Sequence, residues 1–148
     1  MDSNQYVIEV LNVVKQFQNT YQCFKDTFSN KMPPNDKNDG TIPLMLYHKN
    51  GNLVEEVGID GEESGVGSFT SYFFRVEEID PTANKAIMTL IKPFDMGSKP
   101  TLDLTELYRL EKTFIFIEVK LEHISAVQCI SPRLMNRALP IIEPKWES

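Results

Sequence analysis

Residues 113–122, Thr-Phe-Ile-Phe-Ile-Glu-Val-Lys-Leu-Glu, carry the pattern that decides the fold class. From Ile115 onward, apolar and polar side chains alternate, and a period of two places successive side chains on opposite faces of a strand. Phe114 and Phe116 put aromatic rings on the face that the charged residues would otherwise turn to water. The stretch therefore predicts a central strand that is covered on both faces at its first end, by a second layer or by a partner.

Length and composition indicate one globular domain. A chain of 148 residues can bury a core without disulfides or a metal, and its 41% apolar and 24% charged residues are ordinary fractions. The net charge of −6 argues against nucleic acid or an anionic membrane as the main partner. No apolar run approaches the roughly 18 residues that a membrane span needs, so membrane insertion is not expected. No signal peptide is recognised at the N-terminus, so we expect synthesis in the cytosol.

Residues 1–28 are predicted to form one N-terminal amphipathic helix. Apolar side chains recur there at alternating steps of three and four residues, which is the spacing of one helix face. Two interpretations remain open: this stripe packs on the protein's own sheet, or it docks on a neighbouring subunit. The stripe consists of Val7, Val10, Val14, Phe17, Tyr21, Phe24 and Phe28.

Residues 29–41 are rich in proline, asparagine and charge, which predicts a linker between the helix and a β domain over residues 42–131. Part of the linker faintly resembles a calcium-binding loop. Lys37 would occupy the third ligand position and Leu46 the bidentate glutamate position, so a calcium site is excluded.

Turn residues divide the β domain into several short strands. Asn50 and Gly51 join two of them in a hairpin, because both positions of a tight turn accept positive φ. Residues 58–68 are rich in glycine and are predicted to form a solvated loop, without the Gly-Lys-Ser/Thr ending of a phosphate site. Strands joined by short turns are antiparallel neighbours. The predicted strands are 42–49, 53–57, 69–79, 85–92, 113–122 and 124–130.

Together these elements predict a mainly β fold, an antiparallel β-sandwich or partial barrel with one N-terminal amphipathic helix. Residues 132–148 are expected to follow the β domain as an extended tail. Trp146 is the only tryptophan of the chain, and it would anchor this tail either to the body of the protein or to a partner.

No pattern of catalytic or ligand-binding residues is found. The glutamate pairs are adjacent in sequence, and adjacent strand residues point to opposite faces, so they form no shared carboxylate site. His48 and His123 have no cysteine or acidic cluster at ligand spacing. Cys23 and Cys129 are too few for a disulfide scaffold and are expected to be buried thiols. We therefore predict no catalytic residue, no metal, no cofactor and no enzymatic activity.

The order of several short blocks resembles a known family. Over about residues 6–131 the chain is similar to the spore coat proteins Y and Z, from the crust of Bacillus-type spores, and to their exosporium relatives. Tyr6–Val10 resembles the start of the family's helix, and Phe73–Asp80, the closest block, resembles its central strand and turn. The other blocks are Ile42-Pro43-Leu44-Met45-Leu46-Tyr47, Ile117-Glu118-Val119 and Ala126-Val127-Gln128-Cys129-Ile130.

This resemblance implies a structural protein of the outer spore layer, in the coat, crust or exosporium. Such a protein is made in the mother-cell cytoplasm, is deposited on the spore surface, and assembles with itself or with other coat proteins. Family members are rich in cysteine, whereas only Cys129 falls on a cysteine of the matching blocks, so we expect surface packing to hold the subunits together. The alternative is a non-catalytic β-sandwich module that docks a partner protein or a glycan through residues 58–68 and the tail.

Assembly requires complementary patches on the surface of one small domain. Apolar side chains that the fold does not bury are the natural candidates for these patches. The candidates are Val7, Val10, Val14, Phe17, Tyr21 and Phe24 on the helix, together with Phe114, Phe116 and Trp146.

Overall fold

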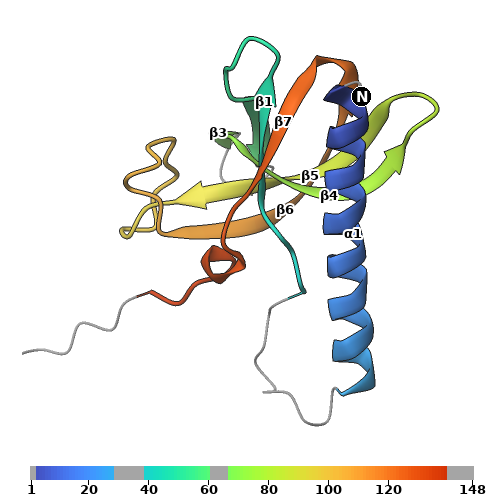
Figure 1. The fold of residues 1–148 in the computed structure, drawn as a ribbon. Helices are drawn as coiled ribbons and strands as arrows, with labels where there is room; N and C mark the ends of the chain where they lie inside the picture. The colour runs from blue at the N-terminus through green and yellow to red at the C-terminus, as the bar shows by residue number, and fades with distance from the viewer. Residues whose placement is uncertain (1–2, 29–38, 61–66, 140–148) are drawn as a thin grey trace, which may run out of the picture.

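The computed structural model describes residues 3–28, 39–60 and 67–139, and shows one long helix beside a twisted antiparallel sheet (Figure 1). A five-stranded sheet has the order β6-β5-β4-β1-β7, and β2 pairs with β3 in a second, two-stranded sheet. The predicted fold class is confirmed. The elements are α1 (Ser3–Thr27), β1 (Leu44–His48), β2 (Glu56–Asp60), β3 (Gly67–Ser71), β4 (Phe73–Asp80), β5 (Lys85–Phe94), β6 (Arg109–Lys120), η2 (Leu121–His123), β7 (Ile124–Cys129) and η3 (Pro132–Leu134).

Two apolar clusters lie on opposite faces of the five-stranded sheet. The larger cluster packs one side of α1 against β1, β4 and β5, and includes Leu44 and Leu46. The smaller cluster contains Met45 and Phe73 and is closed by Met135, which follows η3. Neighbouring residues of a strand point to opposite faces, which explains why Met45 leaves the cluster of Leu44 and Leu46.

The predicted strand 69–79 is divided at Tyr72 into β3 and β4. The buried hydroxyl of Ser71 donates to the Ile91 carbonyl and accepts from the Phe73 amide at 2.9 Å. These bonds satisfy backbone groups at the bend, so the chain can leave the two-stranded sheet and enter the five-stranded one.

The prediction of a solvated loop over residues 58–68 is wrong at both ends, because residues 56–60 and 67–71 pair with each other as strands. Gly58 explains why glycine is found in this strand. A Cβ atom at Gly58 would lie 2.5 Å from the Phe69 ring and 2.9 Å from Cδ1 of Ile115. The glycine permits β2 to approach β3 and β6 closely, which is a packing requirement and not a sign of a loop.

The predicted turn at Asn50 and Gly51 is confirmed. Gly51 has φ +88°, and its amide donates to the His48 carbonyl at 2.9 Å. The hairpin is shorter than expected, because after the bond between the Val54 amide and the Leu46 carbonyl the chain turns away into β2.

The stretch 113–122 lies mainly in β6, which is an edge strand and not the central strand that was predicted. Its alternation is confirmed, since the side chains at 113, 115, 117 and 119 are less exposed than those between them. Phe114 is 92% exposed and Phe116 is 62% exposed. Of the two predicted alternatives, a second layer from the described chain does not cover these rings, and cover by a partner stays a prediction.

Candidate functional site

Helix α1 carries two apolar stripes where the sequence predicted one. The first stripe faces the sheet and is buried, at Val7, Leu11 and Val14. The second stripe lies further round the helix and stays exposed. The large apolar residues exposed on α1 and at its end are Tyr6, Val10, Val13, Phe17, Phe24 and Phe28.

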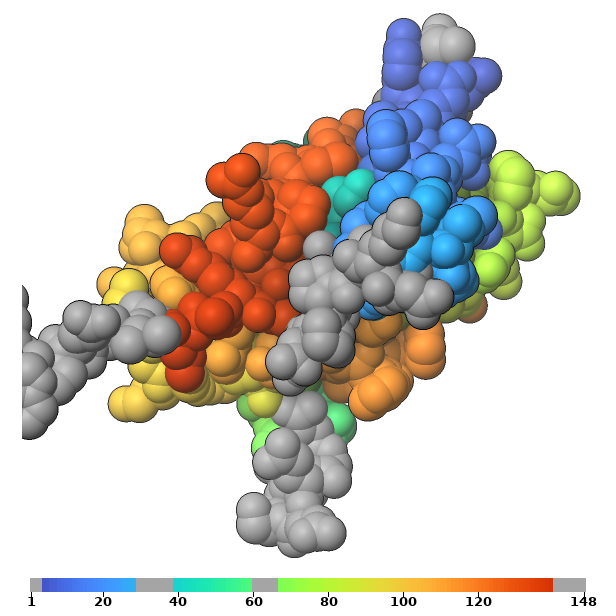
Figure 2. Space-filling view, turned by 90° about the horizontal axis from the view of Figure 1, so that it is seen from below, coloured from blue at the N-terminus to red at the C-terminus, as the bar shows by residue number. Residues whose placement is uncertain are grey.

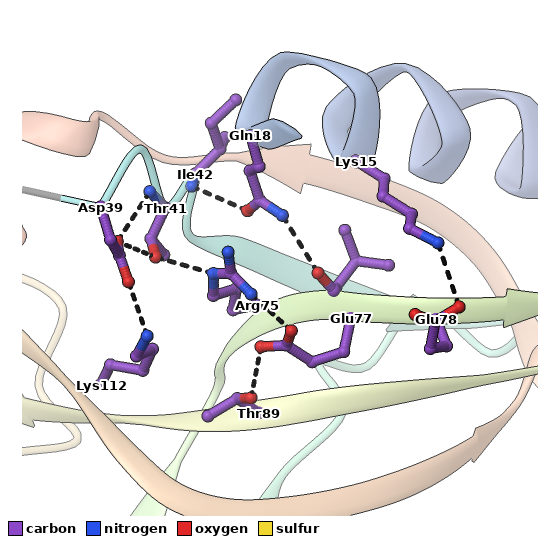
Figure 3. Close-up of polar contacts among 11 residues, drawn as sticks. Lys15, Gln18, Asp39, Thr41, Ile42, Arg75, Glu77, Glu78, Thr89 and Lys112 are labelled. Carbon is purple, nitrogen blue, oxygen red and sulfur yellow. Dashed lines mark hydrogen bonds and ion pairs between the residues drawn. The ribbon is translucent and has the colours of Figure 1, made fainter. Parts of the chain in front are cut away.

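Gln18 continues the buried stripe with a polar group and fixes the helix on the sheet. Its side chain is buried; Nε2 donates to the Val76 carbonyl at 3.0 Å, and Oε1 accepts from the Ile42 amide at 3.0 Å (Figure 3). Strands β1 and β4 pair only at Leu44 and Phe74, so beyond that pair the two strand edges diverge. The amide of Gln18 satisfies one backbone group on each side of this gap.

A polar network ties the segment before β1 to the sheet (Figure 3). The carboxylate of Asp39 accepts a hydrogen bond from Nζ of Lys112 at 2.6 Å and another from the Thr41 amide at 3.0 Å. The Thr41 hydroxyl accepts from Nε of Arg75 at 2.8 Å, and Arg75 also pairs with Glu77. The network positions residues 39–42, which form part of the surface next to α1.

The electrostatics of Asp39 follow from these contacts. Partial burial of its carboxyl group alone would raise its pKa, but the hydrogen bonds from Lys112 and Thr41 outweigh burial and lower the pKa to about 2. Asp39 therefore carries its charge at all physiological pH values.

An apolar groove lies between the exposed stripe of α1 and the chain around the end of β7. Helix α1 and β7 pack side by side (Figure 2). Its first part has a volume of about 580 Å³ and a second part of about 460 Å³ adjoins it, since Phe17, Ile42 and Pro132 line both parts. The first part is otherwise lined by Glu9, Val10, Val13, Val14, Cys129 and Ile130. Tyr21 and Phe24 contribute to the second part, together with Thr20 and Gly40.

Both cysteines are free and exposed, so the prediction of two buried thiols is wrong. Cys129 lines the groove, and desolvation there raises the pKa of its thiol. Cys23 lies on α1, one residue before Phe24. The helical spacing alone could not assign Cys23 to the core, because that depends on which side of α1 meets the sheet.

The predicted assembly residues that the structure describes lie in three places, namely the core, the groove and strand β6. Val7 and Val14 contact the protein's own core, although Val14 also reaches the groove wall. Trp146 lies outside the described residues. Phe114 and Phe116 lie on the outer face of β6. The groove brings together Val10, Phe17, Tyr21 and Phe24.

Several groove residues were not among the predicted assembly residues, and Val13, Cys129 and Ile130 are three of them. Val13 could have been found from its spacing, because it lies three residues from Val10 and four from Phe17. Cys129 and Ile130 could not, since a strand pattern does not reveal which helix passes beside it.

The described part of the chain offers neither a metal-binding cluster nor a helix that could span a membrane. No group of three or more His, Cys, Asp or Glu side chains there could hold a metal ion. Within residues 3–28, 39–60 and 67–139, no helix has the length and apolar character needed to cross a bilayer.

Comparisons with known proteins give two matches. The family model described as "Spore coat protein Z" matches residues 1–132. A relative named "Spore coat protein Z", from Bacillus subtilis (strain 168), is 30% identical over 139 residues, which is 88% of this chain and 92% of the relative. No solved structure matches the chain significantly. The two matches agree with the resemblance that the sequence blocks indicated.

Proposed function

Because the chain belongs to the spore coat protein Z family, we propose that it is a structural subunit of the bacterial spore coat that assembles with itself or with other coat proteins. In this proposal the protein is made in the mother-cell cytoplasm and is deposited on the spore surface, in the coat, crust or exosporium. It catalyses no reaction and requires no cofactor.

The observation that carries this proposal is the second apolar stripe of α1. The core of the single chain is already closed by Val7, Leu11 and Val14, so the exposed residues beside them do not serve its own folding. Phe17, with 63% of its surface exposed, stands at the junction of the two parts of the groove. Burying a phenylalanine side chain contributes about 1.5–3 kcal/mol, so a neighbour that covers this groove gains substantially.

The proposal is tested with Phe17→Asp in the full chain. Because Phe17 is exposed, the variant should keep the melting temperature of the natural protein within a few degrees, whereas a carboxylate in the groove should oppose docking of an apolar surface. Electron microscopy and light scattering of the purified protein should show loss of large assemblies. In sporulating cells, a tagged variant should fail to accumulate on the spore.

Gln16→Asp is the matched control, because it introduces the same charge at an exposed position of α1 that does not line the groove. It should assemble and localise like the natural chain. If Phe17→Asp also assembles and localises normally, the groove is not the assembly surface. If the natural chain stays monomeric at every concentration and is absent from spores, the proposed function itself is wrong.

A second candidate is a non-catalytic module that docks one partner protein or a glycan. The concave form of the groove favours it, since a volume of about 580 Å³ lies in the range of roughly 300–1,000 Å³ found for binding pockets. This candidate predicts a different combination of results. Phe17→Asp would abolish deposition on spores, while the natural protein would remain monomeric in purified form.

A further inference from the structure

One edge of strand β6 is unpaired along most of its length in the described part of the chain. No strand among the described residues bonds to this edge after the first residues of β6. Its other edge pairs with β5 on both sides of residues 113–115, which have no partner in that register. The free edge meets residues 135 and 136 only at Leu110, through a parallel bridge to Met135 and a 2.8 Å bond from the Asn136 amide. An exposed edge of this kind is a template for another strand, unless charges, prolines or bulges block it.

The pairing with β5 shifts register between Thr89 and Ile91, so residues 113–115 of β6 bulge opposite Leu90. The Thr113 hydroxyl donates to the Leu90 carbonyl at 2.6 Å and accepts from the Ile115 amide at 3.1 Å, which satisfies backbone groups on the β5 side of the bulge. The irregularity does not disturb the faces of the strand. Exposed and less exposed side chains alternate without interruption from Lys112 to Glu118. The segment 112–118 therefore keeps the side-chain pattern that pairing with another strand requires.

The exposed side chains of this segment follow a self-complementary order. They are Lys112, Phe114, Phe116 and Glu118, that is, a cation, two aromatic rings and an anion. When the same order is read in the reverse direction, the anion stands opposite the cation and each ring stands opposite a ring. Two copies of the segment therefore match each other when they run antiparallel.

We propose that this edge of β6 is an interface with a second copy of the chain, in which the two β6 strands pair antiparallel about a twofold axis at Ile115. In this register Lys112 lies opposite the partner's Glu118, and Phe114 lies opposite the partner's Phe116. The inference rests on the proposed assembly function and names a surface and a partner for it. A twofold interface of this kind uses the same patch on both copies.

The charges and rings select this register over its neighbours. If the axis moved to position 114, Lys112 would face the partner's Phe116, and Phe114 would face the partner's Phe114. If the axis moved to position 116, Lys112 would face the partner's Lys120. Like charges directly opposite each other are destabilising, and ring pairs and opposite charges are favourable. Of these three registers, only the one with its axis at Ile115 places opposite charges across from each other at both ends of the segment.

The contacts that Lys112 and Glu118 make within the chain are compatible with this interface. Nζ of Lys112 donates to Asp39, and Glu118 pairs with Lys85 at 3.5 Å. An ammonium group has three protons and a carboxylate has two oxygens, so Lys112 can donate to a further partner and Glu118 can accept from one.

The test uses a pair of charge variants in the full chain carrying Phe17→Asp, which removes docking at the groove. Glu118→Lys leaves lysine opposite lysine, and Lys112→Glu leaves glutamate opposite glutamate. Each variant alone should weaken the dimer about tenfold or more, because two favourable pairs become two repulsive ones. An equimolar mixture should recover the dimer, since one copy then carries two anions and the other two cations. Sedimentation velocity measures both effects.

Phe114→Ser provides an independent test that leaves the contacts of Lys112 and Asp39 intact. It should abolish the dimer without lowering the melting temperature, because Phe114 is almost fully exposed. Met96→Ser is the control, since Met96 is also exposed but lies between β5 and β6. It should sediment like the parent chain.

A mixture that remains monomeric, or a Phe114→Ser variant that still dimerises, overturns the β6 interface. That result leaves the proposed function standing if the natural chain still forms assemblies in the electron microscope. If the natural chain forms none and is absent from spores, the proposed function fails as well.

Discussion

The side chain of Gln18 replaces a strand pair that β1 and β4 do not make. We expect Gln18→Leu to fill the same space but to leave the Ile42 amide and the Val76 carbonyl without their partner. Buried unsatisfied groups cost about 1–3 kcal/mol, so the free energy of unfolding should fall by that amount. Denaturant titration measures the change. Gln16→Leu, at an exposed position of the same helix, should change it by less than about 0.5 kcal/mol.

Asp39 makes stability depend on pH. Its folded-state pKa of about 2 lies below the ordinary aspartate value of 3.8, so the ionised carboxylate stabilises the fold. This contribution is fully present above pH 3.8 and is lost as the pH falls toward 2. Asp39→Asn should therefore destabilise the protein near neutral pH by up to about 2 kcal/mol. The difference should shrink when unfolding is measured between pH 4 and pH 2, and a constant difference would contradict this explanation.

At the residue scale the sequence predicted the apolar positions better than the polar ones. The spacing of Val7 and Val14 indicated a helix face correctly. It could not assign a structural role to Gln18, because that role depends on a gap between two strands far away in the chain. Likewise, nothing local to Asp39 indicates that Lys112 lies beside it.

At the scale of elements, the hairpin of β2 and β3 packs against β6 through a close contact at Gly58 that only glycine permits. Gly58→Ala would place a methyl group 2.5 Å from the Phe69 ring and 2.9 Å from Ile115, so these side chains must move. Overpacking of this kind costs about 1–3 kcal/mol. The variant should therefore melt at a lower temperature than the natural protein.

Gly97→Ala is the control for this substitution. The nearest atom to a Cβ at Gly97 is an Asp95 oxygen at 3.4 Å, and its backbone does not require a left-handed conformation. It should leave the melting temperature nearly unchanged. If Gly58→Ala melts at the same temperature as Gly97→Ala, the hairpin is not packed on β6 as closely as the structure indicates.

Helix α1 shows the limit of periodicity as a guide. Heptad-like spacing predicted one stripe, but the structure places Val7 and Val14 on the sheet and leaves Phe17 and Phe24 at the surface. Residues spaced by three and four positions drift round a helix of 3.6 residues per turn, so a long stripe leaves the contact face unless the helix supercoils. The first interpretation, packing on the protein's own sheet, describes Val7 and Val14. Docking on a neighbouring subunit stays a prediction for Phe17 and Phe24.

At the scale of the whole molecule, strand type and antiparallel pairing were predictable, whereas strand order was not. The alternation from residue 115 identified a strand correctly as far as Lys120, where β6 ends. The position of β6 at the sheet edge depends on which strands pair on either side, and hydrophobicity alone suggested the centre. Phe114 and Phe116 were the residues that disagreed with a simple solvent-facing pattern, and they are the ones the fold leaves uncovered.

The groove beside α1 and the edge of β6 would have different consequences for assembly. Pairing through β6 about a twofold axis closes on itself and produces a dimer. If a different surface of the neighbouring subunit docked into the groove, the contact could continue from one subunit to the next. Used together, the two surfaces would build an extended layer from dimers.

The core closes within one chain while Phe17 and Phe114 stay in water. Each newly made subunit would therefore be able to associate with other copies as soon as it has folded. A cell that stockpiled such a protein would risk aggregates in the wrong compartment. Synthesis timed to the moment when a growing spore surface is present would let that surface capture each copy first.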